Sequence, residues 1–150
     1  MAAGYSGTPL PQKLGIKPNA RVALVDAPAD FALALPAGAA LVDGKAREVD
    51  VIVWFVTARA TFAAKLASIA KRMQPAGGLW IAWPKKASGV ATDMTENVVR
   101  EVALPTGLVD NKVCAIDDTW SGLRLVVRLE NRPPKSGATK SAASPSRRRS

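Results

Sequence analysis

The six residues 51–56, VIVWFV, constrain the fold of this chain more than any other segment. The run is continuously apolar and rich in β-branched and aromatic side chains, which is typical of a parallel strand covered on both faces. Apolar residues then recur at 62, 66, 69 and 73, a helical spacing with Arg and Lys on the outer side. A parallel strand followed by a helix is the repeating unit of α/β folds, so an α/β domain is predicted.

Shorter apolar runs predict further strands at 21–25, 79–83, 112–116 and 123–129, with a weak one at 40–42. Further helices are predicted at 29–35 and from Thr92 or Asp93 up to Pro105, the latter with Met94, Val98 and Val102 buried. The six residues between the last two strands make them an antiparallel hairpin. The predicted fold is a small Rossmann-like three-layer sandwich, mostly parallel with a C-terminal antiparallel hairpin.

The link from the weak strand at 40–42 to the run at 51–56 is too short for an ordinary parallel crossover. A crossover between parallel strands of one sheet usually contains a helix, and eight residues leave no room for one. The segment 40–42 is therefore either not a strand or has an unusual position.

Several chemistries are excluded by composition. The chain has no histidine and a single cysteine, Cys114, so Ser-His-Asp triads, His-paired thiolates, zinc clusters and intrachain disulfides cannot form. No metal site is expected, and Cys114 is predicted to be a small buried apolar residue. The sequence has no run of about 18 apolar residues and no signal-like start, which is consistent with a cytoplasmic protein without membrane segments.

Positive charge is concentrated at the C-terminus. Six of the 21 Lys and Arg residues, and none of the 12 Asp and Glu residues, lie after Glu130. We expect three parts: an N-terminal arm at 1–19, a Rossmann-like domain at 20–130, and a disordered basic tail at 131–150. The tail has no aromatic residues, so it predicts weak, salt-sensitive contacts to nucleic-acid phosphates at most.

Two polar segments, 84–93 and 117–124, each begin where a predicted strand ends. In open parallel sheets, ligands bind outside the carboxyl ends of the strands, so the two segments are expected to form two walls of one site. Asp26, which follows the first strand, would lie at the same edge. The predicted ligand-binding residues are Lys85, Lys86, Ser88, Gly89, Trp120, Ser121 and Arg124.

An anionic ligand is the leading expectation for this site. Ser88 and Gly89 precede a predicted helix, whose free N–H groups attract anions, and the lysines and Arg124 add positive charge. Trp120 would form a wall. Asp117 and Asp118 are weak candidates for a general base. Purely structural roles remain open: a solvated lysine pair, aspartates that cap the turn or pair with the lysines, and a tryptophan that covers the core.

The longest motifs resemble a known family. These are GYSGTPLP at 4–11, KLGI at 13–16, the segment 84–93, and VCAID at 113–117 leading into TWSGLR at 119–124. Together they resemble a bacterial domain-of-unknown-function family, number three thousand and fifty-two, over roughly residues 4–128. The resemblance implies no particular activity.

A second, more distant resemblance concerns KPNARV at 17–22 and MQPAGGLWIA at 73–82. Both are similar to the corresponding stretches of class I S-adenosylmethionine-dependent methyltransferases, whose last strand also runs antiparallel. Those enzymes have a Gly-rich loop after the first strand, whereas this chain has DAPAD after Val25. Asp43 stands where an acid would hold the ribose. The resemblance implies the architecture, while S-adenosylmethionine binding in the usual mode is not expected.

Three hypotheses follow. The first is a non-catalytic binding or regulatory module for an anionic small molecule or an acidic partner segment. The second is a divergent methyltransferase or other small-group transferase, with Asp117 or Asp118 as general base. The third is weak nucleic-acid association through the tail.

Overall fold

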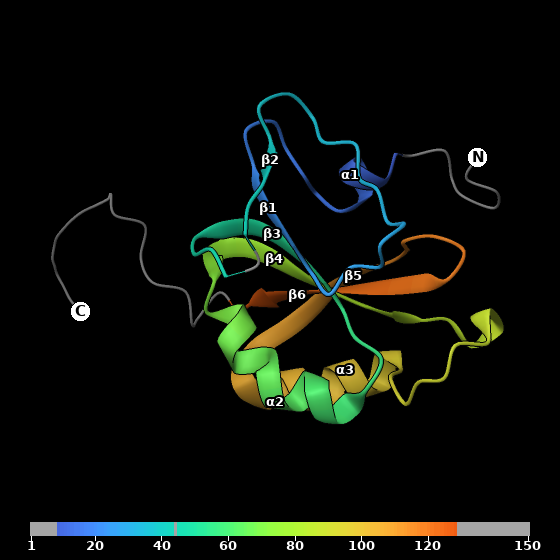
Figure 1. Ribbon diagram of the computed structural model, residues 1–150. Helices are drawn as coiled ribbons and strands as arrows, with labels where there is room; N and C mark the ends of the chain where they lie inside the picture. Colours follow the sequence, from blue (N-terminus) through green and yellow to red (C-terminus); the bar gives the residue numbers. More distant parts are fainter. Residues whose placement is uncertain (1–8, 44, 129–150) are drawn as a thin grey trace, which may run out of the picture.

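The computed structural model describes residues 9–43 and 45–128, which form one six-stranded sheet in the order β2-β1-β3-β4-β6-β5 (Figure 1). The strands are β1 (Arg21–Val25), β2 (Ala40–Leu41), β3 (Val49–Phe55), β4 (Met73–Pro84), β5 (Leu108–Ala115) and β6 (Trp120–Val127). The helices are α1 (Leu10–Lys13), α2 (Arg59–Ala70) and α3 (Glu96–Ala103), with 3-10 turns at Lys86–Ser88 and Leu104–Thr106. The predicted basic tail at 131–150 lies outside the described residues.

Strand direction sets the position of each loop. β2, β1, β3 and β4 pair in parallel, whereas β6 is antiparallel to both β4 and β5. Because β6 is antiparallel to both of its neighbours, β5 runs in the same direction as β4. The carboxyl ends of β1, β3, β4 and β5 therefore face one edge of the sheet. We call this the carboxyl edge, and the opposite one the amino edge. The predicted Rossmann-like sheet with a C-terminal antiparallel hairpin is confirmed.

The short link after 40–42 is explained by the position of β2. β2 is a two-residue edge strand that pairs with the first two residues of β1, Arg21 and Val22. The chain therefore turns back toward the start of β3 without running the length of the sheet, and it needs no crossover helix.

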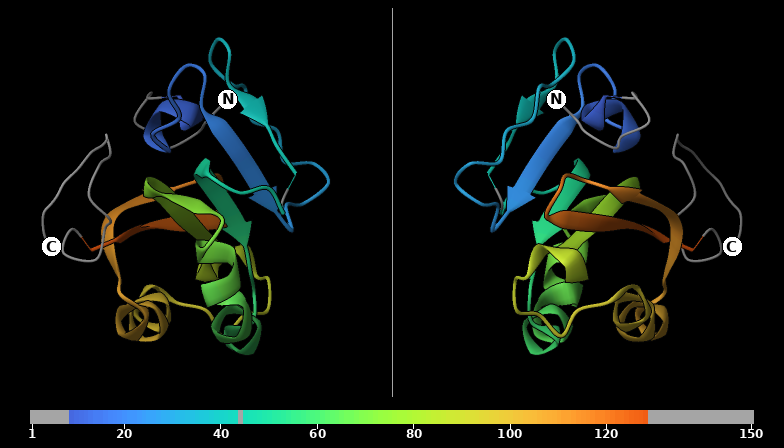
Figure 2. Two further views of the ribbon diagram at one scale, coloured as in Figure 1. Left: turned by 90° about the vertical axis from the view of Figure 1, so that its left-hand side faces the viewer. Right: turned by 90° about the vertical axis from the view of Figure 1, so that its right-hand side faces the viewer.

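One face of the sheet is covered by α2 and α3, which lie side by side in Figures 1 and 2. Trp54 of β3 packs against Phe62 of α2, with ring centroids 5.4 Å apart, and both side chains are fully buried. Leu66 and Ile69 continue the buried stripe of α2, as their spacing predicts. No helix in the described part of the chain is long and apolar enough to cross a membrane.

The other face is covered by α1 and by irregular chain. Leu14 and Ile16 are buried on it, and the indole N–H of Trp80 donates a hydrogen bond of 3.0 Å to the carbonyl oxygen of Leu14. The predicted helix at 29–35 is wrong, because this segment has no helical turn. Its apolar residues Phe31, Leu33 and Leu35 alternate with exposed alanines, a period of two that suits extended chain lying on a sheet.

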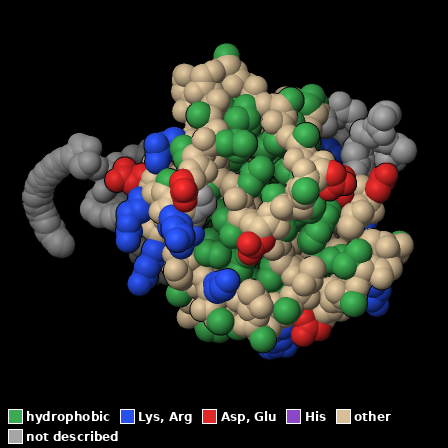
Figure 3. Space-filling model, viewed as in Figure 1, with side chains coloured by type: hydrophobic (Ala, Val, Ile, Leu, Met, Phe, Trp, Pro, Cys, Tyr) green, Lys and Arg blue, Asp and Glu red, His purple; other side chains and the backbone are tan. Residues whose placement is uncertain are grey.

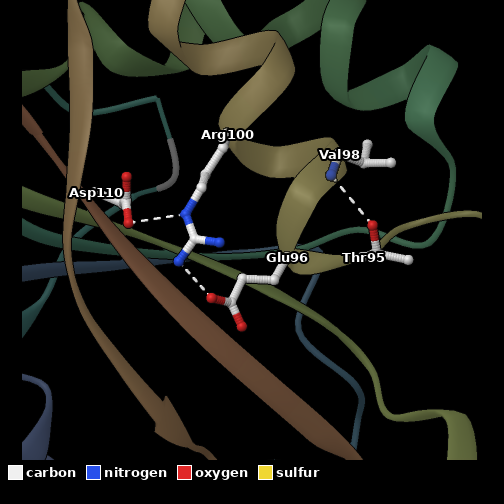
Figure 4. A network of polar contacts seen from close by, with 5 residues as sticks. All are labelled: Thr95, Glu96, Val98, Arg100 and Asp110. Atoms are coloured by element: carbon white, nitrogen blue, oxygen red, sulfur yellow. Dashed lines mark hydrogen bonds and ion pairs between the residues drawn. The ribbon is translucent and has the colours of Figure 1, made fainter.

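The helix α3 begins later than predicted. Its N-cap is Thr95, whose hydroxyl accepts a hydrogen bond from the N–H of Val98 at 3.1 Å (Figure 4). Thr92 and Asp93 bind the start of α2 instead: the Thr92 hydroxyl donates to the Thr57 carbonyl, and the Asp93 carboxylate accepts from the N–H of Arg59. Met94 is buried as predicted but precedes α3. Within the helix, Val99 and Ala103 are buried, and the predicted Val98 and Val102 are partly buried against the core.

A charged network fixes α3 to the sheet. Arg100 donates to Asp110 of β5 at 3.0 Å and also pairs with Glu96 one turn earlier on α3 (Figure 4). The hydrogen bonds that Arg100 donates to Asp110 and then to Glu96 raise the pKa of its guanidinium above the ordinary value. This network links α3 to β5 and has a structural role.

The strand β4 is longer than predicted. It begins at Met73, so the segment Pro75–Gly78, predicted to be the loop that ends the preceding helix, belongs to the strand. The pairing with β3 is irregular between Val49 and Val51, and this irregularity accommodates the extra residues. Gly77 is required here, because a Cβ at this position would lie 2.7 Å from the backbone oxygen of Asp50.

Candidate functional site at the carboxyl edge

The two polar segments singled out in the sequence lie side by side at the carboxyl edge. Pro84 at the end of β4 pairs with Trp120 at the start of β6. The N–H of Lys85 donates a 2.8 Å hydrogen bond to the carbonyl oxygen of Thr119. The predicted meeting of the two segments is confirmed, because β5 runs parallel to β4 and the turn after β5 lies at the same edge.

Two of their polar side chains, those of Asp117 and Ser88, are engaged in local turns. One oxygen of Asp117 accepts from the N–H groups of Thr119 and Trp120, both at 2.8 Å. The Ser88 hydroxyl donates to the carbonyl oxygen of Lys85 at 2.6 Å and accepts from the N–H of Val90 at 3.1 Å. Asp117 and Ser88 thus hold the two loops in shape, as the structural alternative predicted for the aspartates.

The expected anion site before a helix is absent from the described loop. Gly89 follows a 3-10 turn with φ of 78°, and α3 begins seven residues later, at Glu96. The premise that Ser88 and Gly89 open a helix is therefore wrong. Lys86 and Asp118 are exposed, and Lys85 is half-buried.

Two predicted residues of β6 point away from this edge site. Arg124 pairs with Trp80 in the middle of β4, and a Cβ at Gly78 would lie 2.4 Å from its Nε. Arg124 lines a cavity of about 310 Å³ at the amino edge, together with Lys17, Asn19 and Gln74. Ser121 neighbours Trp120 in the strand, so it faces the α2–α3 side of the sheet, whereas Trp120 faces the other. The structure does not place either residue at the proposed anion site.

A different cavity, of about 280 Å³, lies at the carboxyl edge between β1 and β3. This is the topological switch point, because the chain continues from β1 outward to β2 and from β3 in the opposite direction to β4. Open α/β sheets bind ligands at such points. We call it the switch-point cavity; its side-chain walls include Asp26, Phe55, Thr57, Thr61 and Trp120.

Aromatic rings form the apolar wall of the switch-point cavity. Phe55 and Trp120 are edge-to-face, with centroids 5.0 Å apart, and Phe31 approaches Phe55 from the other side at 4.9 Å. Trp120 is half-buried, so part of its ring remains available to a ligand. Trp120 was predicted as a wall from the sequence, whereas Phe55, Thr57 and Thr61 were not predicted to line the site. Phe55 and Thr57 lie at the end of the 51–56 run, which is the signal that could have identified them, and Thr61 follows on α2.

Asp26 supplies the carboxylate of this cavity and has an unusual backbone. Its φ is 56°, in the left-handed region that side chains other than Gly, Asn and Asp seldom adopt. Asp26 directly follows β1, at the position where this sequence lacks the Gly-rich loop of class I methyltransferases. An aspartate thus takes the turn that glycine would otherwise make, and it places a charged group at the mouth of the switch point.

The N-terminus of α2 borders the cavity through Thr57, Ala58 and Thr61 but already has an anion. The Asp93 carboxylate accepts from the N–H of Arg59 at 2.7 Å. The helix start is therefore capped by the chain's own acid. It does not favour an anionic ligand in the switch-point cavity.

Cys114, on β5, is half-buried beside the apolar residues of the face that α1 covers. Burial raises the pKa of its thiol, and the positive charges of Lys13 and Lys112 oppose this only in part. Because the thiolate is the reactive form, alkylation by iodoacetamide should reach half of its maximal rate at a higher pH in the folded protein than in the same chain unfolded in denaturant. An equal or lower midpoint in the folded protein would contradict the burial argument.

Family comparison agrees with the resemblance noted from the motifs. A family model described as "Protein of unknown function (DUF3052)" matches residues 24–129. The chain belongs to this family. Sequence comparison with curated proteins gives no match.

The solved structures similar to this DUF3052 domain include methyltransferases. A SAM-dependent methyltransferase from Aquifex aeolicus has a TM-score of 0.55 and 13% identity, over 77% of this chain and 87% of that one. A tRNA methyltransferase from B. subtilis has a TM-score of 0.48, 10% identity and coverages of 85% and 66%. Aeropyrum pernix fibrillarin with bound S-adenosyl-L-methionine has a TM-score of 0.46 and 15% identity, over 82% of this chain and 70% of that one. The first shows that the fold is methyltransferase-like; at this identity it shows nothing further.

The described residues do not fit S-adenosylmethionine in the usual mode. The turn after β1 has Asp26 in place of a glycine loop. Asp43, the candidate ribose acid, follows a strand that pairs only with the first two residues of β1, and it does not line the switch-point cavity. Its carboxylate accepts from the N–H of Lys45 at 2.7 Å instead.

Proposed function

We propose that this DUF3052 domain is a non-catalytic binding module whose switch-point cavity holds a small molecule with a flat apolar group and a hydroxyl or amino group. The observation that carries the proposal is the combination of an aromatic wall and one carboxylate, Asp26, at the topological switch point. Phe55 and Trp120 would contact the flat group. Asp26 would accept a hydrogen bond from the hydroxyl or amino group.

The charge of the cavity argues against the anionic ligand that the sequence suggested. Asp26 is the charged residue among the described residues that line it. Arg124 belongs to the amino-edge cavity, and the Ser88 hydroxyl is engaged in its own turn. The negative charge of Asp26 repels an anion and attracts a cation. A neutral or cationic ligand is therefore favoured over an anionic one.

The two aspartates that the sequence offers as general bases are poorly placed for catalysis, which supports a binding role. The alternative of a divergent transferase requires Asp117 or Asp118 as general base. Asp117 accepts two backbone hydrogen bonds in its turn, and Asp118 is exposed and does not line the switch-point cavity. A general base must lie within hydrogen-bonding reach of the proton it removes.

The test is a thermal-shift screen of the full-length protein against nucleosides, S-adenosylmethionine, S-adenosylhomocysteine and aromatic amines. A ligand present at about 100 times its dissociation constant adds about 2.7 kcal/mol to the free energy of unfolding, a shift of several degrees. Asp26→Asn should weaken binding of a hit about tenfold or more, because a hydrogen bond to a charged acceptor contributes about 1.5–3 kcal/mol. Asn tolerates the left-handed backbone, so the fold should be unchanged.

Asp118→Asn is the matched control, since it removes an exposed carboxylate outside the cavity. A hit weakened by Asp26→Asn and kept in Asp118→Asn supports the proposal. A hit indifferent to Asp26→Asn places the ligand elsewhere, and a screen without hits contradicts small-molecule binding. Conversion of S-adenosylmethionine to S-adenosylhomocysteine by the protein would favour the transferase alternative.

A further inference from the structure

A hollow of about 580 Å³ lies between the β2–β3 connection and the C-terminal part of α2, and it shares no lining residue with the switch-point cavity. Lys45 and Arg47 come from the connection, and Lys71 and Arg72 directly follow α2. Its floor consists of the small α2 residues Ala64, Ala67 and Ser68. We call it the basic groove. In Figure 3, Lys and Arg side chains gather on this side of the molecule, with some acidic side chains at the border.

Three of the four cationic side chains of the basic groove are not paired with acidic side chains of the described structure. Lys45, Arg47 and Lys71 are exposed, and their side chains make no hydrogen bond or ion pair to the residues that the structure describes. The backbone carbonyl oxygen of Arg47 accepts a hydrogen bond from the side chain of Arg21. The guanidinium group of Arg47 takes no part in that bond. Clustered like charges repel one another, so this arrangement costs some stability unless an anion is present.

Local structural roles account for only part of the cluster. Lys71 and Arg72 follow the C-terminus of α2, where cations are favourable to the helix dipole. Lys45 and Arg47 lie on a separate connection, where no helix end calls for positive charge. That connection also carries Asp43, whose carboxylate binds the N–H of Lys45, and the exposed Glu48. The two pairs of cations, 24 or more positions apart in the chain, converge on one groove.

The lining of the groove indicates which anion it suits. An acidic protein partner would need large apolar or aromatic anchors, whereas the floor offers only Ala and Ser side chains. Single-stranded nucleic acid is bound through aromatic platforms, and the described lining has none. The phosphate backbone of a duplex needs only cations that reach it. Small floor residues let that backbone approach closely.

We propose that the basic groove binds the phosphate backbone of duplex nucleic acid without reading its sequence. Lys45, Arg47 and Lys71 contact phosphates, and Arg72 adds positive charge to the groove. This site belongs to the folded domain, so it is distinct from the contacts that the sequence predicts for the C-terminal tail. It is also independent of the switch-point cavity and its ligand.

The test measures binding of the full-length protein to a fluorescent DNA duplex of about 20 base pairs, by anisotropy, between about 50 and 200 mM salt. The variant is the triple Lys45→Ala, Arg47→Ala, Lys71→Ala. Each lost phosphate contact changes the slope of log K against log salt by about 0.9, so the triple variant should flatten it by about 2.7. Affinity at about 100 mM salt should fall at least about tenfold.

Two controls separate the groove from general charge and from damage to the fold. Lys86→Ala removes an exposed lysine at the opposite, carboxyl edge and should change affinity little. Glu48→Gln removes an exposed negative charge beside the groove and should strengthen binding roughly twofold, because it reduces repulsion of the phosphates. A gain of affinity cannot result from unfolding.

The outcomes are distinct. A flattened slope in the triple variant, with tighter binding by Glu48→Gln, establishes the groove. An unchanged slope overturns it and assigns any binding to the tail. Binding of a poly-glutamate peptide to the groove without binding of the duplex overturns the choice of nucleic acid in favour of an acidic protein partner.

Discussion

Trp80→Phe is expected to lower the free energy of unfolding by about 2–4 kcal/mol, while the same change at Trp54 should cost about 1–2 kcal/mol. Both indoles are fully buried, and both variants lose the same ring volume. The indole N–H of Trp80 donates to the Leu14 carbonyl, which Phe would leave unpaired in the core. The indole N–H of Trp54 has no hydrogen-bond partner in the described structure. Replacement of Trp54 by Phe therefore removes a buried polar group without breaking a hydrogen bond.

Chemical denaturation of the wild type and both variants measures the two costs. Because the volume change is matched, the difference between the variants reports the hydrogen bond that ties the segment after α1 to the sheet. Equal costs would show that this bond contributes nothing. A larger cost at Trp54 would show that its N–H has a partner after all.

Gly77→Ala is expected to destabilise the protein by about 2–3 kcal/mol, and the neighbouring Gly78→Ala by about 1 kcal/mol. A Cβ at Gly77 would meet the backbone oxygen of Asp50 at 2.7 Å, and strand β3 cannot move without losing its pairing. A Cβ at Gly78 would meet the side chain of Arg124, which is flexible enough to turn aside.

A double-mutant cycle distinguishes the two clashes. In an Arg124→Ala background the cost of Gly78→Ala should largely disappear, whereas the cost of Gly77→Ala should remain. The readout is again the free energy of unfolding. If Arg124→Ala also reduced the stability cost of Gly77→Ala, the clash of Gly77 would be with Arg124. The close approach of β3 and β4 at the amino edge would then not explain the need for this glycine.

Local patterns predicted the elements that are buried on both sides or strongly periodic. The run at 51–56, the helix with Phe62, Leu66 and Ile69, and the final hairpin are confirmed, because each depends on residues close in sequence. The helix at 29–35 was mispredicted because its alanines favour helix, while the alternation of Phe31 and Leu33 suits extended chain on the sheet. Tertiary packing decided between the two.

The meeting of the two polar segments was predicted correctly, but most residues that line the switch-point cavity were not. The short hairpin link determines only that the last two strands are antiparallel. That 84–93 and 117–124 converge at one edge also requires the 112–116 strand to run parallel to the 79–83 strand, as it does in the structure. Trp120 and Arg124 are close in sequence, yet four residues of strand separate them by about 13 Å, which places Arg124 toward the amino edge. Phe55, Thr57 and Thr61 gave no chemical signal in the sequence.

Hydrophobic period and motifs are local properties, so they sufficed to predict the α/β class, the family and the sheet edge at which the two polar segments meet. The fold in three dimensions was needed to show that Asp26 shares a cavity with Trp120, and that Lys45 and Lys71 share a groove. These groupings depend on strand order and register, which are set by packing between residues far apart in the chain.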